Sequence, residues 1–493
     1  MIRFGTDGWR GIIADDFTFQ NVRYAAQGIA NFLRARPEHK VVIGYDCRFG
    51  ADRFAQEVAR ITAAAGIKTY LTDAPSPTQV SSWTILELQA DGAIVLTASH
   101  NPAAFLGIKY KPEYAGSASP EVVAELEAEI AAVIDADQVG LIDFQEALDG
   151  GAVEVIDPRP AYHRQISKMV DLDAIRAAGL KILHDPMYGS GAGYVADIVG
   201  PGGPTRVDQV RAERNPGFGG IHPEPIPQNL RATLDLMRQG HEGRMATGEG
   251  GWDLGIATDG DADRVGIVDE TGTFVNQLQV YALLMDYLLG TLGWRGPVVR
   301  TLTSTSMADR LAQIHGVECH EVQVGFKYVG PKMIETGAVM GGEESGGFGF
   351  RGHIPERDGI LAGLYFADMI VKAGRPLSRI LAELTEKVGP HFYDRRDVNL
   401  PREAFEEIKS STYQRFGAAM PAEVAGSRVV RTRSDDGFKL YLEDGAWVLV
   451  RFSGTEPLLR IYSEAPSRER VAELIGAIAA HLGLDAANPN AHA

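Results

Sequence analysis

Short apolar runs alternate with stretches of helical periodicity over most of the chain. Val41–Tyr45, Lys68–Thr72 and Ala93–Thr97 have the composition of buried strands. Arg53–Ala65 and Pro120–Ile134 repeat their apolar residues with the period of a helix. Strands that alternate with helices in this way are typical of α/β layers. The first part of the chain is therefore predicted to form an α/β unit.

Two further units of the same kind follow. One begins near Ile182, at "ILHDPMYGSGAG", and ends around "DLGIATDGDADRVGIVD". The other begins with a helix over Gln277–Leu289, has "PVVRTLTS" as a strand and ends near Lys387. The glycine-rich segment 188–194 follows a predicted strand, but Tyr194 stands where a dinucleotide-binding fingerprint needs glycine. We interpret that segment as a tight turn.

The C-terminal part has a different pattern. In "RVVRTRSDDGFKLYLEDGAWVLVRFSGTEPLLRIYSEA", alternating runs are separated by Asp-Gly turn signals at 436–437 and 444–445, which predicts an antiparallel meander. A helix follows over Ser467–Leu482, with Ser467 as its N-cap. We therefore predict three α/β units and a smaller α+β domain. The predicted domains span residues 1–160, 161–270, 271–390 and 391–493.

Composition and charge narrow the functional classes. The chain of 493 residues is 45% hydrophobic and 23% charged, as in soluble globular proteins. A formal charge of −17 disfavours nucleic acid and anionic lipid as partners. No apolar run reaches the roughly 18–20 residues that span a bilayer, and the N-terminus lacks the apolar core of a signal peptide. Since two cysteines suit a reducing compartment, we expect a cytoplasmic protein without a membrane partner.

The strongest chemical signal is "ATDGDADRVGIVDE", residues 257–270. Asp259, Asp261 and Asp263 place carboxylates at alternate positions with small residues between them, which suits Mg²⁺ or Ca²⁺. An EF-hand is excluded because Arg264 stands where that loop needs glycine and because the flanking segments are predicted strands. The remaining alternative is an acidic surface turn.

Other loops combine glycine with polar side chains. Segment 341–359, "GGEESGGFGFRGHIPERDG", carries carboxylate, hydroxyl and imidazole groups that suit sugar hydroxyls, unless it is a disordered loop. Segment 451–460, "RFSGTEPLLR", has the hydroxyls, turn amides and guanidinium groups of an anion site, unless it is a hairpin turn with exposed arginines. An acidic protein that acts on an anion has to gather its basic residues locally. Basic residues recur in such loops at Arg10, Lys109, Arg264, Lys327, Arg357, Arg451 and Arg460.

The segment "TASHNP" leaves two interpretations open. Ser99 and His100 follow a predicted strand, so they are either a nucleophile beside its base or part of a capped turn. The dipeptide alone does not decide between them.

Six motifs, in this order, resemble the α-D-phosphohexomutase superfamily, which includes phosphoglucomutase, phosphomannomutase and phosphoglucosamine mutase. They are "FGTDGWRG", "TASHNPAAFLGIK", "DGDADR", "VGFKYV", "GGEESGGFGFRGHIPERDG" and "RFSGTEPLLRIY". The resemblance implies three similar mixed α/β domains around a central cleft, with a smaller C-terminal α+β domain.

The resemblance also implies a role for individual residues. Ser99 is the expected phosphoserine, and it shares Mg²⁺ with Asp259, Asp261 and Asp263. The expected catalytic groups beside Ser99 are His100, Lys109, Arg10 and Arg264. The expected substrate-binding residues are Gly325, Lys327, Glu343, Ser345, His353 and Arg357. The expected phosphate-binding residues are Arg451, Ser453, Gly454, Thr455 and Arg460.

The implied reaction moves a phosphoryl group between the 1- and 6-positions of a hexose, through a 1,6-bisphosphate. Glucose is the expected sugar, with glucose 1,6-bisphosphate as activator and intermediate; mannose or both sugars are the alternative. Glu344 counts against glucosamine, because that branch usually has glutamine there, and Leu106-Gly107 departs from the family's Asn-Gly before the lysine. A metal-dependent sugar-phosphate phosphatase and a sugar-phosphate sensor without catalysis are the alternative functional classes. A separate phosphate loop favours retention of the intermediate over hydrolysis.

Overall fold

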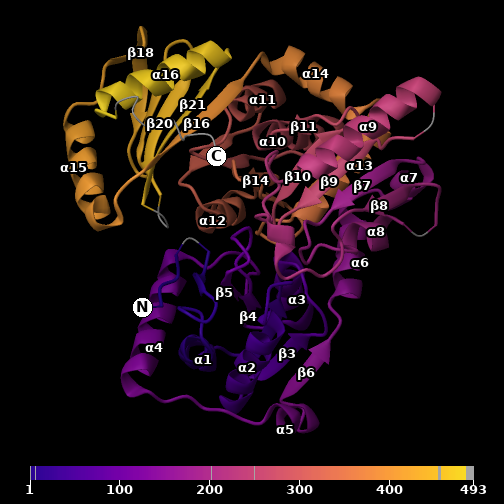
Figure 1. The fold of residues 1–493 in the computed structure, drawn as a ribbon, viewed down its shortest axis with the longest axis vertical. Helices are drawn as coiled ribbons and strands as arrows, with labels where there is room; N and C mark the ends of the chain where they lie inside the picture. Colours follow the sequence, from indigo (N-terminus) through magenta and orange to yellow (C-terminus); the bar gives the residue numbers. More distant parts are fainter. Residues whose placement is uncertain (1, 6, 201, 249, 454–456, 485–493) are drawn as a thin grey trace.

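The computed structural model describes residues 2–5, 7–200, 202–248, 250–453 and 457–484. Four sheets follow one another along the chain, and Figure 1 shows the first (indigo) at one end of the molecule and the last (yellow) beside the third. The predicted class, three mixed α/β domains and a smaller C-terminal domain, is confirmed.

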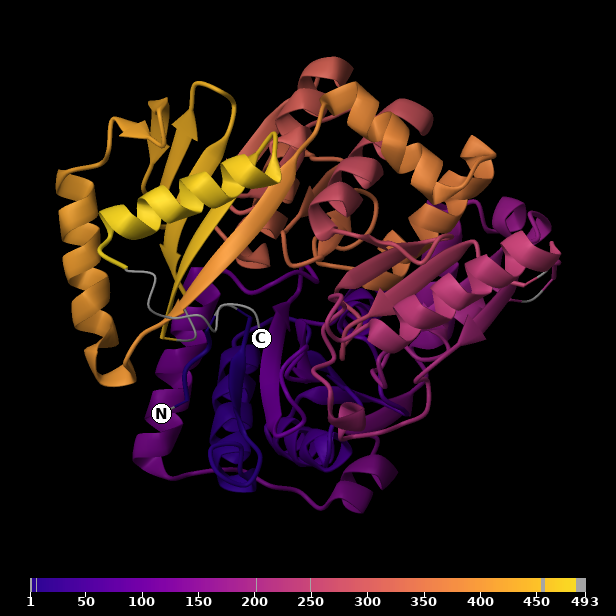
Figure 2. The same cartoon turned by 45° about the horizontal axis from the view of Figure 1, so that its top comes forward.

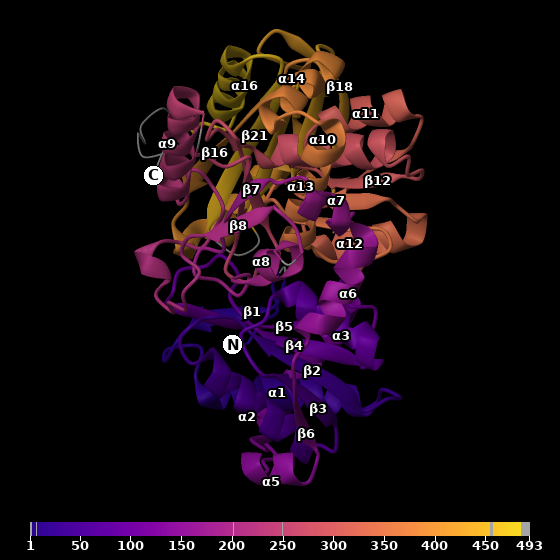
Figure 3. The ribbon, with the colours of Figure 1, turned by 90° about the vertical axis from the view of Figure 1, so that its right-hand side faces the viewer.

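The first sheet has six strands in the order β1-β5-β4-β2-β3-β6. Its elements are β1 (Trp9–Ile12), α1 (Phe19–Arg34), β2 (Lys40–Tyr45), α2 (Ala51–Ala64), β3 (Lys68–Thr72), α3 (Thr78–Leu88), β4 (Gly92–Leu96), β5 (Phe105–Pro112), α4 (Pro120–Ala136), α5 (Phe144–Asp149) and β6 (Val153–Ile156). Every residue of β4 is buried, as its apolar sequence requires of a central strand. Helix α6 (Arg159–Met169) then leads to the second sheet (Figure 3).

The second sheet has the order β11-β10-β9-β7-β8, and the third has the order β13-β12-β14-β15. The second unit consists of α7 (Leu172–Ala177), β7 (Lys181–Asp185), α8 (Tyr194–Val199), β8 (Arg206–Gln209), a 3₁₀ turn at Phe218–Gly220, α9 (Arg231–Thr247), β9 (Leu254–Thr258), β10 (Val265–Asp269) and β11 (Phe274–Val275). The third consists of α10 (Gln277–Asp286), a π-helical turn at Tyr287–Thr291, β12 (Val298–Thr301), α11 (Met307–His315), β13 (Cys319–Val322), α12 (Phe326–Thr336), β14 (Met340–Gly342), β15 (Phe348–Phe350), α13 (Gly359–Ala373) and α14 (Leu377–Val388).

The three sheets share one arrangement of four strands. In each, the first of these four strands (β2, β7 or β12) lies between two parallel neighbours, which are the second and third of the four. The fourth strand (β5, β10 or β15) pairs antiparallel with the third. The loop between the third and fourth strands therefore leaves each sheet from the carboxyl ends of the parallel strands, where ligands bind in open α/β sheets.

The C-terminal domain is an antiparallel sheet in the order β16-β21-β20-β19-β18-β17, crossed by a helix in Figure 2. It is formed by β16 (Phe392–Asn399), a 3₁₀ turn at Arg402–Ala404, α15 (Phe405–Ala418), β17 (Glu423–Val424), β18 (Ser427–Arg433), β19 (Phe438–Leu442), β20 (Trp447–Phe452), β21 (Leu458–Ala465) and α16 (Arg468–His481). Ser467 is the N-cap of α16, as predicted, and its side chain accepts a hydrogen bond from the amide of Arg470.

Most predicted elements are observed within a few residues of their predicted ends. The predicted helix at Gln277–Leu289 is α-helical only to Asp286 and continues as the π-helical turn. Segment 188–194 is a turn up to Gly193, as predicted, and α8 begins at Tyr194. No helix within the described ranges is long and apolar enough to cross a membrane.

Candidate functional site

The loops with predicted chemistry occupy equivalent places in the three α/β units. The Ser99 loop joins β4 to β5, the aspartate loop joins β9 to β10, and the loop with Glu343 joins β14 to β15. Each loop connects the third and fourth strands of the shared four-strand arrangement. The repeated topology therefore places the serine, the aspartates and the glutamate at equivalent ends of the three sheets.

Ser99 lies at the contact between the first two units. Its side chain is buried, its φ is +53°, and its hydroxyl donates to Asp259 Oδ2 at 2.9 Å. His100 Nδ1 lies 3.4 Å from the same hydroxyl, which is long for a hydrogen bond. The structure therefore places the serine against the aspartate loop more closely than against its neighbouring histidine.

His100 is surrounded by positive charge. Burial, followed by the nearby guanidinium groups of Arg264 and Arg10, holds the pKa of His100 well below its usual value. Its imidazole is therefore neutral at pH 7 in this arrangement.

The three aspartates form a compact, fully buried cluster. One carboxylate oxygen from each of Asp259, Asp261 and Asp263 lies within 4.8 Å of the others. Oδ1 of Asp261 and Oδ1 of Asp263 are buried acceptors without a hydrogen-bond partner. Burial, and then the two neighbouring carboxylates, raises the pKa of Asp259 well above its usual value. Unsatisfied oxygens and mutual repulsion fit a bound divalent cation of the Mg²⁺ type, because a hard cation would satisfy both.

Lys109, on β5, reaches the same cluster from the first unit. Its Nζ lies 2.8 Å from Asp261 Oδ2, 3.1 Å from Asp263 Oδ2 and 2.8 Å from Asp7 Oδ2. Burial opposes the charge of this amine, but the aspartates outweigh burial and raise the pKa of Lys109 above its usual value. Lys109 is therefore a fixed cation among carboxylates here.

Two arginines complete the charge around Ser99. Arg10 Nη1 donates to Asn101 Oδ1 at 2.7 Å, so it is held in the serine loop. The backbone amide of Arg264 donates to Asp259 Oδ1 at 3.1 Å, and its Nη1 donates to Glu224 Oε1 at 3.3 Å. Burial works against the charge of Arg264, but Glu224 and the aspartates outweigh it and raise its pKa.

The third unit contributes the predicted sugar loop. Glu343 Oε2 lies 3.5 Å from Arg357 Nη1, and burial raises the pKa of this carboxyl. The hydroxyl of Ser345 is a buried donor without a hydrogen-bond partner. Glu344 points to the C-terminal domain instead, where its Oε1 accepts from Tyr393 at 3.2 Å and from Arg395 at 3.4 Å. The loop thus combines polar groups that lack a close partner with a contact to the last domain.

Other predicted substrate-binding residues differ in their surroundings. Arg357 lies inside the charged cluster, with Nη2 at 2.8 Å from Asp263 Oδ2 and 2.6 Å from Asp7 Oδ2. Gly325 is the N-cap of α12, and the Nζ of Lys327 lies over the ring of Tyr328. The His353 side chain is fully buried, where its Nε2 pairs with Asp358 at 2.9 Å and its ring stacks on Trp83. Its Nδ1 is buried without a hydrogen-bond partner, and its role in substrate binding stays a prediction.

The predicted phosphate loop joins β20 to β21. Gly454 and Thr455 lie outside the described residues, while Ser453 is buried. Arg451 and Arg460 are direct cross-strand partners in the β20–β21 ladder. Their side chains have acidic neighbours: Arg451 Nε donates to Asp436 at 2.8 Å, and Arg460 Nε lies 3.6 Å from Asp397. Directly opposite side chains lie on one face of a sheet, so two guanidinium groups are gathered there, which suits an anion.

Some residues of the site were missed in the sequence. Asp7 binds Lys109, Lys111 and Arg357 at once. The hydroxyl of Thr78, at the start of α3, donates to Asp261 Oδ2 at 2.6 Å. Asp7 lies in the motif "FGTDGWRG", so the motif could have indicated it as a site residue. The sequence around Thr78 contains no motif that indicates a role in the site.

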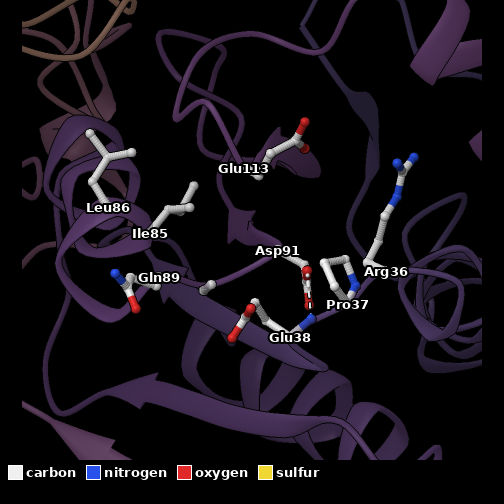
Figure 4. A pocket seen from close by; sticks show the side chains of 9 residues that line it. Arg36, Pro37, Glu38, Ile85, Leu86, Gln89, Asp91 and Glu113 are labelled. Atoms are coloured by element: carbon white, nitrogen blue, oxygen red, sulfur yellow. Dashed lines mark hydrogen bonds between the residues drawn. The ribbon is translucent and has the colours of Figure 1, made fainter.

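A hollow in the first unit lies away from this cluster. It has a volume of 430 Å³ and lies beside the amino ends of β2 and β4, opposite the loop that carries Ser99 (Figure 4). Its lining includes Arg36, Glu38, Asp91 and Glu113. Because Asp91 already accepts from the amides of Glu38 and Lys40, the hollow has no convergent set of open donors that indicates a ligand.

Comparison with known proteins covers nearly the whole chain. The phosphoglucomutase/phosphomannomutase alpha/beta/alpha domains I, II and III match residues 1–136, 160–272 and 276–388, and the C-terminal domain of that family matches residues 407–481. A phosphoglucomutase/phosphomannomutase of Thermococcus kodakarensis is 29% identical, with 96% of each chain covered. A phosphoglucosamine mutase of Solidesulfovibrio magneticus is 32% identical, with 97% of each chain covered.

A solved structure from Thermus thermophilus is also similar. It carries a provisional phosphomannomutase name, is 34% identical, and superposes with a TM-score of 0.82 over 98% of this chain and 99% of its own. The relatives thus carry names that differ in the sugar but agree in the class of reaction. With the four domains in order and the buried aspartate cluster in the second, this chain belongs to the α-D-phosphohexomutase superfamily and is a phosphohexomutase.

Proposed function

We propose that this phosphohexomutase interconverts glucose 1-phosphate and glucose 6-phosphate through a phosphorylated Ser99 and a glucose 1,6-bisphosphate intermediate. The observation that supports this most directly is the buried Ser99 hydroxyl, 2.9 Å from a carboxylate of the three-aspartate cluster. A serine that faces a metal-binding cluster suits a phosphoryl carrier, because the cation and the serine oxygen can share the transferred group.

The residues around Ser99 offset the charge of the transferred group. A Mg²⁺ ion held by Asp259, Asp261 and Asp263 would polarise the phosphoryl group and neutralise part of its charge. Lys109 lies within the same cluster, and Arg10 and Arg264 lie at its edges. Charge that spreads over the phosphoryl oxygens in the transition state is stabilised by such fixed cations. His100 Nδ1 lies 3.4 Å from the Ser99 hydroxyl.

A second phosphate site favours a mutase over a phosphatase. Arg451 and Arg460 lie in the C-terminal domain, apart from the aspartate cluster in the second unit. A bisphosphate held at its far end by these arginines can turn and return its other phosphoryl group to Ser99, whereas a phosphatase would have no need for this clamp. Glu344 joins the loop between β14 and β15 to the same domain through Tyr393 and Arg395, which supports a sugar loop that acts together with this clamp.

The carrier role of Ser99 is tested by the mass of the intact protein. After exposure to glucose 1,6-bisphosphate, the protein is expected to gain one phosphate, mapped to Ser99 by peptide analysis. Ser99→Ala is expected to gain none and to lose turnover while it unfolds at the wild-type temperature. Chelation should stop turnover of the wild type, and added Mg²⁺ should restore it. Phosphate on another residue, full activity of Ser99→Ala, or stoichiometric release of inorganic phosphate would each contradict the proposal.

The sugar is tested by competing substrates. Glucose 1-phosphate is expected to be turned over about tenfold better, as kcat/KM, than glucosamine 1-phosphate, a difference that a few polar contacts can supply. This expectation rests on the resemblance, because Glu344 stands where the glucosamine branch usually has glutamine. Equal or reversed values in a coupled assay would exclude glucose as the preferred sugar, and mannose 1-phosphate in the same assay would show whether both C2 epimers are accepted.

A further inference from the structure

A buried arginine outside the reactive cluster holds the Ser99 loop. Arg48 lies between β2 and α2, and its side chain is fully buried. Nε donates to Asp46 Oδ2 at 3.0 Å. Nη1 donates to the carbonyls of Pro102 and Phe105 at 2.8 and 2.9 Å, and Nη2 donates to those of Ser99 and Asn101 at 2.6 and 2.7 Å. A guanidinium has five N–H donors, and each of them here has an acceptor.

The amide side of Ser99 is held by the same group of residues. The Ser99 amide donates to Thr97 Oγ1 at 2.9 Å, and the Thr97 hydroxyl donates in turn to Asp46 Oδ2 at 2.7 Å. Asp46 Oδ1 accepts from the amide of Arg48 at 3.0 Å. Asp46, Arg48 and Thr97 thus fix both the N–H and the C=O of Ser99, and we call these three residues the serine bracket.

The bracket holds Ser99 in a backbone conformation that a serine would otherwise leave. A non-glycine residue with φ of +53° lies in the left-handed region, which is strained for a serine and persists only where surrounding contacts impose it. The contact between the Ser99 hydroxyl and Asp259 is made in that conformation. The guanidinium of Arg48 also lies 4.8 Å from the ring centre of Phe218, which belongs to the second unit, as Asp259 does.

We propose that Arg48 is a positioning residue for phosphoryl transfer: it aims the Ser99 oxygen at the aspartate cluster without touching the substrate. This inference rests on the proposed role of Ser99 as phosphoryl carrier. A general stabilising role is the alternative, but a purely apolar core would fill this space without burying a charge. Four of the five hydrogen bonds of Arg48 go to backbone carbonyls of the loop that carries Ser99. This arrangement fixes the orientation of that loop.

The distinguishing variant is Arg48→Lys. Lysine keeps the charge but has a single nitrogen with three donors, so it cannot hold four carbonyls spread over the loop. Arg60→Lys is the matched control, because Arg60 is also an arginine of the first unit that binds a backbone carbonyl, of Ile142 at 2.8 Å, and a carboxylate, of Glu57 at 2.7 Å. The measurements are the single-turnover rate of Ser99 phosphorylation by glucose 1,6-bisphosphate, KM for glucose 1-phosphate, and the melting temperature.

Arg48→Lys is expected to slow phosphorylation of Ser99 about 100-fold, the size of effect produced by misplacing a reacting atom by about 1 Å. KM for glucose 1-phosphate should stay within about threefold of wild type. The predicted sugar and phosphate loops lie in other domains, so binding of the substrate before the reaction is unchanged. Arg60→Lys should lower the melting temperature without changing the rate. Thr97→Val removes the hydrogen bond to the Ser99 amide without removing a charge, so it should slow the same step. If Arg48→Lys does not fold, a folded Thr97→Val that reacts at the wild-type rate overturns the positioning role.

The outcomes separate this inference from the proposed function. If the wild type is not phosphorylated on Ser99, the proposed function fails. If the wild type is phosphorylated and a folded Arg48→Lys reacts at the wild-type rate, the positioning role is overturned and the function stands. A loss of rate shared by Arg60→Lys, or a rise in KM at an unchanged rate, also overturns it.

Discussion

The serine loop and the aspartate loop approach each other closely at Gly260. A Cβ atom at this position would lie 2.4 Å from the carbonyl oxygen of Ser99, the oxygen that Arg48 binds. Gly260→Ala is therefore expected to push the loops apart, with a loss of about 100-fold in kcat for a displacement of about 1 Å and about 1–3 kcal/mol of stability for overpacking. Steady-state kinetics and thermal unfolding measure the two effects.

Gly243→Ala is the matched control for this substitution. Gly243 lies in α9, and a Cβ there would meet no atom within 4 Å. Alanine at an open helical position should leave kcat unchanged and stabilise the protein by about 0.5–1 kcal/mol. Full activity of Gly260→Ala would show that the two loops do not need this close contact.

At the scale of single residues, local spacing in the sequence predicts some functional side chains. It does not predict those whose partners are distant in the sequence. The alternate aspartates at 259, 261 and 263 were recognisable because their ligand pattern is local. The bond from Thr78 to Asp261 joins residues 183 positions apart, so no local pattern could predict it. His353 is a further case: its loop composition predicts sugar binding, and the structure adds contacts with Asp358 and Trp83 that composition does not indicate.

At the scale of elements, the alternation of strands and helices predicted three units of one kind but not which of their loops correspond. Hydrophobic period defines which segments are strands, while strand order and direction depend on contacts between distant segments. The antiparallel pairing of β4 with β5, of β9 with β10 and of β14 with β15 is what makes the three reactive loops equivalent. That correspondence was visible only in the structure.

An inner strand of the second sheet, β7, holds a buried histidine whose effect on stability can be tested. His184, on β7, is fully buried, and burial lowers its pKa to about 4 even though Asp185 acts in the opposite direction. The unfolded chain, with a pKa of about 6.5 for histidine, binds more protons than the folded chain between these two values. Stability is therefore retained above pH 6.5 and lost as the pH falls towards 4.

His184→Leu removes this proton-linked contribution. The difference in unfolding free energy between the variant and the wild type should shift in favour of the variant by about 3 kcal/mol as the pH falls from roughly 6.5 to 4, because one pKa unit corresponds to about 1.4 kcal/mol. Urea unfolding of both proteins across this range measures the difference, and the other acid-titrating groups cancel because both proteins have them. A difference that does not vary with pH would show that His184 titrates normally.

At the scale of the whole molecule, the units are joined in different ways. One continuous hydrophobic core runs through the second and third units, including Ile256, Val298 and Leu364, whereas the first unit and the C-terminal domain each have a core of their own. The first unit meets the third partly through charge: Lys111 Nζ lies 2.7 Å from Glu356 Oε2, and both side chains are fully buried. Composition could not predict this, because a buried pair is indistinguishable in sequence from surface charges.

The Lys111–Glu356 pair predicts strong coupling across this boundary between units. Burial disfavours the charge of Glu356, but Lys111 and Arg357 outweigh burial and lower its pKa. Lys111→Met leaves Glu356 and Asp7 short of a cation, and stranding a buried charge costs about 3–5 kcal/mol. Adding Glu356→Gln removes the stranded charge, so the double variant should be destabilised by less than the sum of the single variants, with an interaction energy of about 0.5–3 kcal/mol.

The unfolding free energies of the four proteins in this double-mutant cycle measure the coupling. The control pair is Lys68 and Glu154, which lie 3.0 Å apart on the surface of the first sheet, where an exposed ion pair contributes only about 0–1 kcal/mol. Lys68→Met should therefore have little effect, and its cycle with Glu154→Gln should be close to additive. Additivity at Lys111 and Glu356 as well would mean that water or other side chains satisfy each charge independently, and that the first and third units are not held together by this pair.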